Sequence, residues 1–414
     1  MLPISCLKKS LNNNNIKFTP KSGLMGIMTR RERLTATLRG EPVDRPAVNF
    51  YEIGGFLVDP DDPDEYNIYN SPSWRPLLDL AENQTDIIRL VSPVRAQSHL
   101  SWDGSSNVGR RSQFVREKVW EENNSRFTRK TFMIGGKELT SLTRRDKNLD
   151  TVWTVECLLK TIEDIKLFLE LPDEIFDENI NISHLAEEEK KLGDRGIVMV
   201  DTEDPVCAVA SLFNLEDFSI FGYTEQKMCH KLLEKHARYI HKRTEQVAKE
   251  FPGRLWRIYG PEYVTEPLLP AHLFEDYVVR YTGPMVKHIR DYGGMVRIHS
   301  HGRIRNVVDY FIEMGADATD PLEPPPHGDV ELKYMREKYG KQLVLFGNIE
   351  IAYIENMPSD QFRKMVRKAV ADGTSGDGRG FVLTPTAAPY GRSISELTFR
   401  NYQIMVEEVE RLKC

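Results

Sequence analysis

The sequence lacks any pairing pattern among its cysteines. Its five cysteines, Cys6, Cys157, Cys207, Cys229 and Cys414, are spread over 414 residues, and no two of them form a CxxC motif. A disulfide framework is therefore not expected, and neither is a zinc site built from thiolates alone. Any metal site in this chain has to rely on histidine and carboxylate side chains.

Long apolar runs and a strong charge of one sign are also missing. No apolar run approaches the roughly 20 residues that span a bilayer, and the opening MLPISCLKKS has too short an apolar run for a secretory signal. The net charge is -6, whereas nucleic-acid-binding proteins carry clustered basic surfaces. We therefore expect a cytoplasmic protein that binds neither a membrane nor nucleic acid.

A glycine-rich phosphate loop is absent after the first predicted strand, which disfavours an open, doubly wound sheet. Instead, short apolar runs alternate with amphipathic helices, the pattern of βαβ units and a parallel sheet. Eight parallel strands close a (β/α)8 TIM barrel, whose active site lies at the C-terminal ends of the strands. The predicted strands are 47–51, 86–91, 197–200, 254–259, 294–298, 316–319, 343–346 and 381–383.

Residues 115–155 interrupt this rhythm. Polar and apolar residues alternate here, with turn signals at Asn123-Asn124 and Gly135-Gly136, which predicts an antiparallel β-hairpin insertion after the second strand. It would lie over one mouth of the barrel, either covering a substrate, docking a partner or serving as decoration. The polar start predicts a disordered or extended tail over residues 1–27, so we expect one barrel domain over residues 28–414.

The strongest group of chemically active residues follows the predicted strand 294–298. His299 and His301 are separated by one residue, so an extended backbone would place both imidazoles on the same side. Two neutral imidazoles at a strand end can share zinc or another divalent metal. The alternatives are two partly exposed loop histidines, or an anion site at the next helix N-terminus.

Three acids follow the neighbouring strands. Glu262 comes after the preceding strand, and adjacent strands lie about 4.8 Å apart, so it could complete a site of two histidines and one glutamate with an open position. A carboxylate at a helix N-terminus is the alternative. Asp320 and Glu323 follow the next strand as further ligands, general bases or partners that orient a histidine. We therefore predict catalytic Glu262, Asp320 and Glu323, and metal ligands Glu262, His299 and His301.

Other strand ends supply candidate substrate contacts. Phe50 and Tyr51 near the first strand end could wall a pocket for a flat organic substrate, or could simply pack in the core. Polar residues follow the third, seventh and eighth strands. The predicted substrate-binding residues are Phe50, Tyr51, Glu203, Asn348 and Tyr390.

Five segments, in this order, resemble the uroporphyrinogen decarboxylase superfamily: TRRERLTATLRGEPVDRPAV, HSHG, GADATDP, VLFGNIE and GRGFVLTPTAAPYG. The resemblance covers about residues 28–412 and implies a TIM barrel. The true decarboxylases carry an arginine-rich signature after the first strand that grips substrate carboxylates. This chain reads NFYEIGGF there, so the resemblance points to the branch of corrinoid-linked methyltransferases.

The methylcobamide:coenzyme M methyltransferases of that branch hold zinc through a His-x-Cys pair and a later cysteine. Here the pair is similar to His299-x-His301, the later cysteine falls near Thr386, and Glu262 is the candidate replacement. A site of histidine and carboxylate is a stronger Lewis acid than a thiolate site, which suits an ether oxygen. The resemblance therefore implies an aromatic O-demethylase methyltransferase.

Such an enzyme would use Zn²⁺ or another divalent metal and would pass a methyl group from a methoxylated aromatic compound to the cobalt of a corrinoid. A partner protein would carry that corrinoid, and the methyl donor would be a small molecule. The sequence leaves open whether two copies of the chain form a homodimer. The alternatives are a decarboxylase of porphyrin metabolism, a methyltransferase with a thiol acceptor of the coenzyme M type, and a non-catalytic barrel that binds a partner.

Overall fold

The computed structural model describes residues 27–94, 114–176, 178, 180–376 and 380–413. The predicted tail over residues 1–27 therefore lies outside the described residues, except for Ile27. None of the described helices is long and apolar enough to cross a membrane.

Eight parallel strands form one sheet in the order β1-β12-β11-β10-β9-β8-β7-β2. Each predicted strand overlaps one of them. The edge strands β1 and β2 meet where the Asp86 backbone N–H donates to the Val48 carbonyl at 2.7 Å, so the sheet curls round as in a TIM barrel. The strands are β1 Ala47–Val48, β2 Ile87–Val91, β7 Gly196–Glu203, β8 Leu255–Tyr259, β9 Met295–His299, β10 Ala318–Asp320, β11 Val344–Ile349 and β12 Phe381–Pro385.

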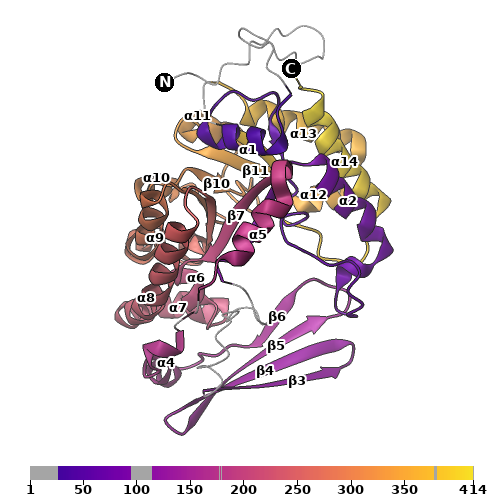
Figure 1. Cartoon of the computed structure of the whole chain (residues 1–414). Helices are drawn as coiled ribbons and strands as arrows, with labels where there is room; N and C mark the ends of the chain where they lie inside the picture. The colour runs from indigo at the N-terminus through magenta and orange to yellow at the C-terminus, as the bar shows by residue number, and fades with distance from the viewer. Residues whose placement is uncertain (1–26, 95–113, 177, 179, 377–379, 414) are drawn as a thin grey trace.

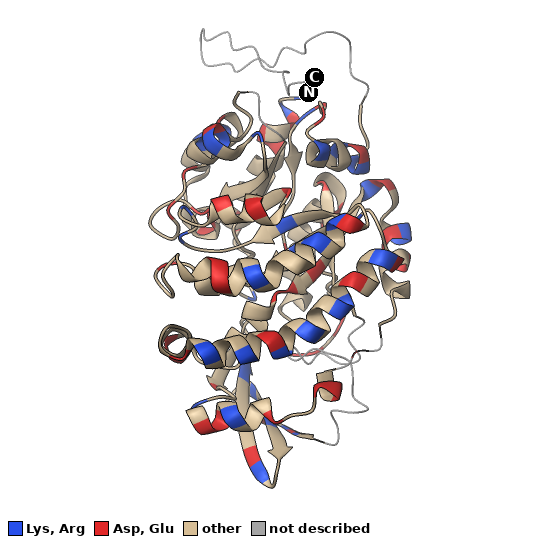
Figure 2. Cartoon of the chain, turned by 90° about the vertical axis from the view of Figure 1, so that its left-hand side faces the viewer, with Lys and Arg blue, Asp and Glu red and all other residues tan. Residues whose placement is uncertain are grey.

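Helices surround the curled sheet (Figure 1). They are α1 Arg30–Arg39, α2 Arg75–Gln84, α4 Ile162–Leu169, α5 Ser183–Leu192, α6 Pro205–Ala210, α7 Leu215–Thr224, α8 Gln226–Glu250, α9 Arg280–Asp291, α10 Val308–Met314, α11 Leu332–Tyr339, α12 Ile351–Asn356, α13 Ser359–Gly373 and α14 Glu396–Glu410. Short 3-10 turns cover Ile68–Asn70, Pro72–Trp74, Asp173–Phe176, Gly193–Arg195 and Pro261–Val264, and a π-helical turn, Glu275–Val279, precedes α9. Lys and Arg alternate with Asp and Glu along the described helices of the face in Figure 2, without a large region of one sign.

Helix α1 closes the N-terminal end of the curled sheet. It begins with a capping box in which the Thr29 side chain accepts from the Glu32 backbone and Glu32 accepts from the Thr29 backbone. Leu34 and Leu38 are then buried in a compact apolar cluster with side chains from the strands. The described strand members of this cluster are Ala47, Ile88, Leu90, Met199, Leu255, Ala318, Val344, Phe346 and Val382.

The predicted antiparallel insertion after the second strand is confirmed, but it has four strands rather than one hairpin. Its strands are β3 Val115–Glu122, β4 Ser125–Ile134, β5 Lys137–Asp146 and β6 Val152–Glu156. Both predicted turns are present, because Asn123, Asn124, Gly135 and Gly136 all have positive φ angles between 51° and 80°.

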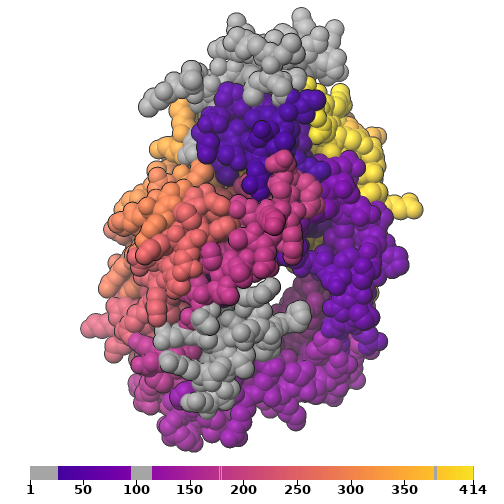
Figure 3. Space-filling view, in the orientation of Figure 1, coloured from indigo at the N-terminus to yellow at the C-terminus, as the bar shows by residue number. Residues whose placement is uncertain are grey.

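This antiparallel sheet is fixed to the rest of the chain at both ends. At one end Phe132 and Leu139 are buried in the main core. At the other end the Arg126 guanidinium pairs with Asp64 at 2.9 Å, and the Asp150 backbone donates to the Tyr390 carbonyl at 2.9 Å. Tyr390 follows β12, so the antiparallel sheet lies on the side of the strand C-termini. Figure 3 shows an opening between it and the parts of the chain above.

Candidate active site at the strand ends

Two rows of side chains cross the C-terminal half of the curled sheet. The register of β7, β8, β9 and β10 aligns Glu203 with Tyr259, Tyr259 with His299, and His299 with Asp320. Two residues earlier, Asp201 aligns with Arg257 and Arg257 with Arg297. Because side chains two apart on a strand point to the same face, the two rows lie one above the other on that face.

His299 is held by Asp320. The His299 Nδ1 atom lies 2.8 Å from Asp320 Oδ2, and both side chains are almost completely buried. Burial lowers the pKa of His299 to about 4, which outweighs the opposing effect of Asp320. Burial also raises the pKa of Asp320, but the charge of Arg297 and the hydrogen bond from His299 outweigh it and lower the value to about 2. His299 is therefore neutral with its proton on Nδ1, because a carboxylate can only accept, and its Nε2 carries a lone pair.

His301 repeats this arrangement with Glu323. Its Nδ1 donates to Glu323 Oε1 at 2.9 Å, and the Gly302 backbone N–H donates to the other oxygen at 2.7 Å. Burial lowers the pKa of His301, but its hydrogen bond to Glu323 and the charges of Glu323 and Glu262 raise it more, so the net shift is upward. The His299 and His301 rings are 4.7 Å apart between centroids and perpendicular.

Glu262 lies in the 3-10 turn Pro261–Val264 after β8, where its Oε2 accepts from the Gly260 backbone N–H at 3.0 Å. Burial raises the pKa of Glu262, and the nearby His301 partly opposes that shift. The structure thus brings the predicted ligands His299 and His301 into ring contact and places Glu262 within electrostatic reach of His301. Among the described residues, no three His, Cys, Asp or Glu side chains are arranged as metal ligands.

Two buried arginines in the same region were not predicted from the sequence. Arg257 binds both oxygens of Asp201, at 2.5 and 2.9 Å, and also donates to the Tyr51 hydroxyl. Arg297 pairs with Asp320 at 2.8 Å, and its guanidinium lies 4.7 Å from the centre of the Phe346 ring. Each arginine interrupts an apolar strand: Arg257 lies two residues before Tyr259, and Arg297 lies two residues before His299. That spacing is the sequence signal that identifies them.

Tyr51 is the predicted substrate contact that lies beside the histidines. Its ring stacks on His299 at 5.8 Å between centroids, and its hydroxyl is 3.5 Å from His299 Nε2. Its backbone has a φ of 57°, in the left-handed region that non-glycine residues rarely adopt. Burial raises the pKa of Tyr51 far above its ordinary value, so the hydroxyl is neutral.

The other predicted substrate contacts have different surroundings. Phe50 is completely buried and packs on Tyr402 of α14 at 4.7 Å between ring centroids, so it belongs to the main core. Glu203 pairs with Arg243 at 2.9 Å. Asn348 is half-buried near the end of β11, in register with Thr384. Tyr390 is 50% exposed after β12.

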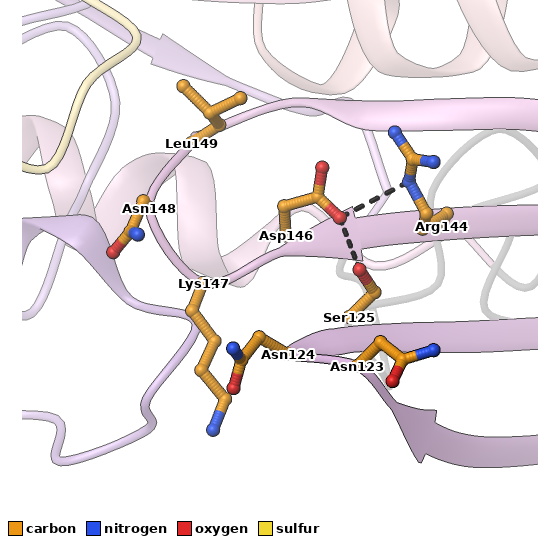
Figure 4. A pocket seen from close by; sticks show the side chains of 8 residues that line it. All are labelled: Asn123, Asn124, Ser125, Arg144, Asp146, Lys147, Asn148 and Leu149. Carbon is orange, nitrogen blue, oxygen red and sulfur yellow. Dashed lines mark hydrogen bonds and ion pairs between the residues drawn. The ribbon is translucent and has the colours of Figure 1, made fainter.

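A separate pocket of about 580 Å³ lies on the antiparallel sheet (Figure 4). At its centre Asp146 accepts from Ser125 and pairs with Arg144. None of the predicted site residues lines it; the lining consists of Asn123, Asn124, Ser125, Arg144, Asp146, Lys147, Asn148 and Leu149.

Two solved structures are similar to this chain to different extents. The solved structure of a methyltransferase from Methanosarcina mazei is similar with a TM-score of 0.56 and 13% identity, covering 94% of this chain and 100% of that chain. At this identity the likeness shows a shared fold alone. A structure of the IOLI protein with a binding zinc atom covers 56% of this chain and 95% of that chain at 11% identity, but its TM-score of 0.30 carries no argument.

A search of curated proteins found no match. The family model described as uroporphyrinogen decarboxylase (URO-D) matches residues 159–411, which is more than half of the chain. The chain therefore belongs to the uroporphyrinogen decarboxylase family.

Proposed function

We propose that this chain is a metal-dependent methyltransferase that moves a methyl group from a methoxylated aromatic compound to the cobalt of a corrinoid carried by a partner protein. The curled sheet is taken as a closed (β/α)8 barrel within a single domain over residues 28–414. Zn²⁺ or another divalent metal would be held by Glu262, His299 and His301.

One observation carries this proposal: two adjacent imidazoles each have Nδ1 bound to a carboxylate. Asp320 holds His299 and Glu323 holds His301, so the Nε2 atoms are the ring nitrogens that can bind a metal. At His299 the metal would replace the long contact with the Tyr51 hydroxyl, which lies 3.5 Å from Nε2. Histidines that bind metals in proteins usually have their second nitrogen held in this way. With Glu262 the donor set would be two imidazole nitrogens and a carboxylate, the composition of a catalytic zinc site with an open position. Binding would draw these three side chains together, because the described residues hold no preformed group of three ligands.

A divalent metal at this site would supply a Lewis acid for the methoxy oxygen, which gains negative charge as the methyl group leaves. In the overall reaction the C–O bond breaks, its electron pair stays on the aromatic oxygen, and the methyl carbon takes an electron pair from the acceptor. Asp320 and Glu323 orient the histidines, and Asp320 fixes the neutral tautomer of His299. Tyr51 covers one face of His299 and keeps water from it.

Decarboxylation of a substrate with several carboxylates is less well supported. Such a substrate needs free positive charge, but Arg257 and Arg297 are paired with Asp201 and Asp320. The fold shared with a structure named as a methyltransferase supports methyl transfer in addition.

The test uses purified protein, a methoxyarene and reduced cobalamin, with bound metal and methylcobalamin as the two readouts. We expect His299→Ala and His301→Ala each to lower the metal affinity or the rate by more than about 10–100-fold, which is the typical effect of losing only a residue that orients a metal ligand. A chelator should abolish activity. His272→Ala, which changes an exposed histidine, is the control. If both site variants keep the metal content and rate of the wild type, the proposal is wrong; activity that survives the chelator would favour a decarboxylase instead.

A further inference from the structure

A second pair of histidine and carboxylate lies at the strand ends, formed by His327 and Glu350. The loop after β10 folds back on itself, because the Gly328 backbone donates to the Pro324 carbonyl at 3.0 Å and the Val330 backbone to the Glu323 carbonyl at 3.3 Å. A Cβ atom at Gly328 would lie 2.1 Å from the Glu323 carbonyl oxygen, so the tight fold requires glycine. This fold brings the His327 ring to the end of β11.

Glu350 lies directly after β11, and only one of its two carboxylate oxygens has hydrogen-bond partners. Its Oε2 lies 3.3 Å from His327 Nδ1 and accepts from the Thr386 hydroxyl at 3.3 Å. Its Oε1 is buried and has no hydrogen-bond partner among the described residues, although the residue is only 6% exposed. A buried carboxylate oxygen without a partner is costly, so this atom indicates a ligand that donates to it.

The charge around Glu350 indicates which kind of ligand. Burial raises the pKa of Glu350, and the negative charge of Glu323 raises it further, so the two carboxylates lie within electrostatic reach of each other. Within the described residues, neither Glu323 nor Glu350 forms an ion pair with a lysine or arginine. This part of the strand ends therefore attracts cations.

Tyr390 adds an aromatic surface within electrostatic reach of Glu323. It is half exposed, and the charges of Glu52, Glu323 and Glu355 act on its hydroxyl. An aromatic ring next to carboxylates is the combination that recognises an organic ammonium group, through cation–π attraction and charged hydrogen bonds.

We propose that Glu350, together with Glu323 and Tyr390, binds a positively charged amine on the substrate, so that the preferred methyl donors are methoxyarenes with an ammonium group rather than methoxybenzoates. Only the description of this ligand as a methyl donor rests on the proposed function. The binding of an ammonium group does not itself require methyl transfer.

The experiment compares three ligands of matched size by calorimetry at neutral pH: 3-methoxybenzylammonium, 3-methoxybenzyl alcohol and 3-methoxybenzoate. We expect the wild-type protein to bind the ammonium compound at least about tenfold more tightly than the benzoate, because one charged hydrogen bond is worth that much. Glu350→Gln should lose about tenfold in affinity for the ammonium compound and little for the alcohol. Glu313→Gln removes the same charge from an exposed position on α10 and should change neither affinity.

The inference is overturned if the benzoate binds as tightly as the ammonium compound, if the ammonium compound does not bind, or if Glu350→Gln and Glu313→Gln behave alike. The ranking of the three ligands by the wild-type protein decides the question even if Glu350→Gln does not fold. No corrinoid is present in this assay. Tighter binding of the ammonium compound by a protein that transfers no methyl group would therefore contradict the proposed function alone. Methyl transfer by a protein without that binding preference would contradict this inference alone.

Discussion

The two ends of the curled sheet are built from the same strands but filled with opposite chemistry. At the N-terminal end, Leu34 and Leu38 of α1 pack with inward-pointing apolar side chains. At the C-terminal end, a row containing Asp201, Arg257 and Arg297 is followed by the row that contains His299. The N-terminal end gains stability by removing apolar surface from water. At the C-terminal end the charges of Arg257 and Arg297 stay buried because Asp201 and Asp320 balance them.

The difference shows where this fold can change its chemistry. A paired charge at the strand ends makes little net contribution to stability but becomes costly as soon as its partner is removed. An apolar side chain at the other end contributes in proportion to its own size and depends less on any single neighbour. The following predictions test this contrast, beginning with the largest expected effect.

Breaking one buried ion pair should have the largest effect. Arg257→Leu leaves the carboxylate of Asp201 without its partner, so we expect a loss of about 3–5 kcal/mol in the free energy of unfolding, measured by urea denaturation. The double variant Asp201→Leu/Arg257→Leu removes both charges and should recover most of that loss. If the double variant is as unstable as the single one, the two residues do not act as a balanced pair.

Removing apolar volume at the opposite end should cost slightly less. Leu34→Ala truncates a completely buried side chain, and we expect a loss of about 2–5 kcal/mol in the same measurement. Ligand binding at the strand ends should stay as in the wild type, since no site residue is touched. Leu57→Ala, at a position that is 65% exposed, is the matched control. A large loss of binding in Leu34→Ala would mean that the two ends are coupled.

The charged end should also make stability depend on pH. Asp204 is completely buried directly after β7, and burial raises its pKa to about 7 despite bonds from the Cys207 backbone and the Thr282 hydroxyl. Between about pH 4 and pH 7 the folded protein then holds a proton that the unfolded chain has lost. The contribution of Asp204 to the free energy of unfolding should therefore fall as pH rises, by up to about 1.4 kcal/mol per pH unit.

Denaturation at several pH values checks this sign. Asp204→Asn should flatten the dependence over that range, whereas Asp194→Asn, at an exposed position, should leave it unchanged. An identical pH profile for Asp204→Asn and the wild type would show that this carboxyl group is ionised throughout.

The smallest predicted effect concerns the cap of α1. Thr29→Ala removes the hydroxyl that accepts from the Glu32 backbone at 3.1 Å, and we expect a loss of about 1 kcal/mol in the free energy of unfolding. Thr29→Ser keeps the hydroxyl and should lose much less. Equal losses in the two variants would show that the methyl group, and not the hydrogen bond, is responsible.

Most of the fold could be predicted because its signals are local. Each strand of the curled sheet is a short apolar run, and both turns of the insertion are marked by Asn-Asn and Gly-Gly. The third hairpin of the insertion, which pairs β6 with β5, was not predicted. Its edge strand is mostly exposed, so it lacks a clear alternation of buried and exposed residues.

The site was predictable only in part, since contacts between strands depend on register. Residues directly after a strand are visible in the sequence, which is how His299, His301, Asp320 and Glu323 were identified. Arg257 and Arg297 lie inside apolar strands, and only their alignment with each other shows that they meet. Phe50 and Tyr51 are neighbours in the chain, but one packs on α14 and the other on His299, and the sequence does not show which is which.

The alignment of Arg257 with Arg297 has a consequence for the history of the family. Two guanidinium groups on neighbouring strands are compatible only while Asp201 and Asp320 balance them. Losing any one of the four charges would leave another charge repelled by its neighbour or without a partner. A single substitution at any of these positions should therefore destabilise the protein. Relatives should therefore either retain all four residues or have replaced all four together. Relatives that have replaced the set are the ones in which we expect a different substrate.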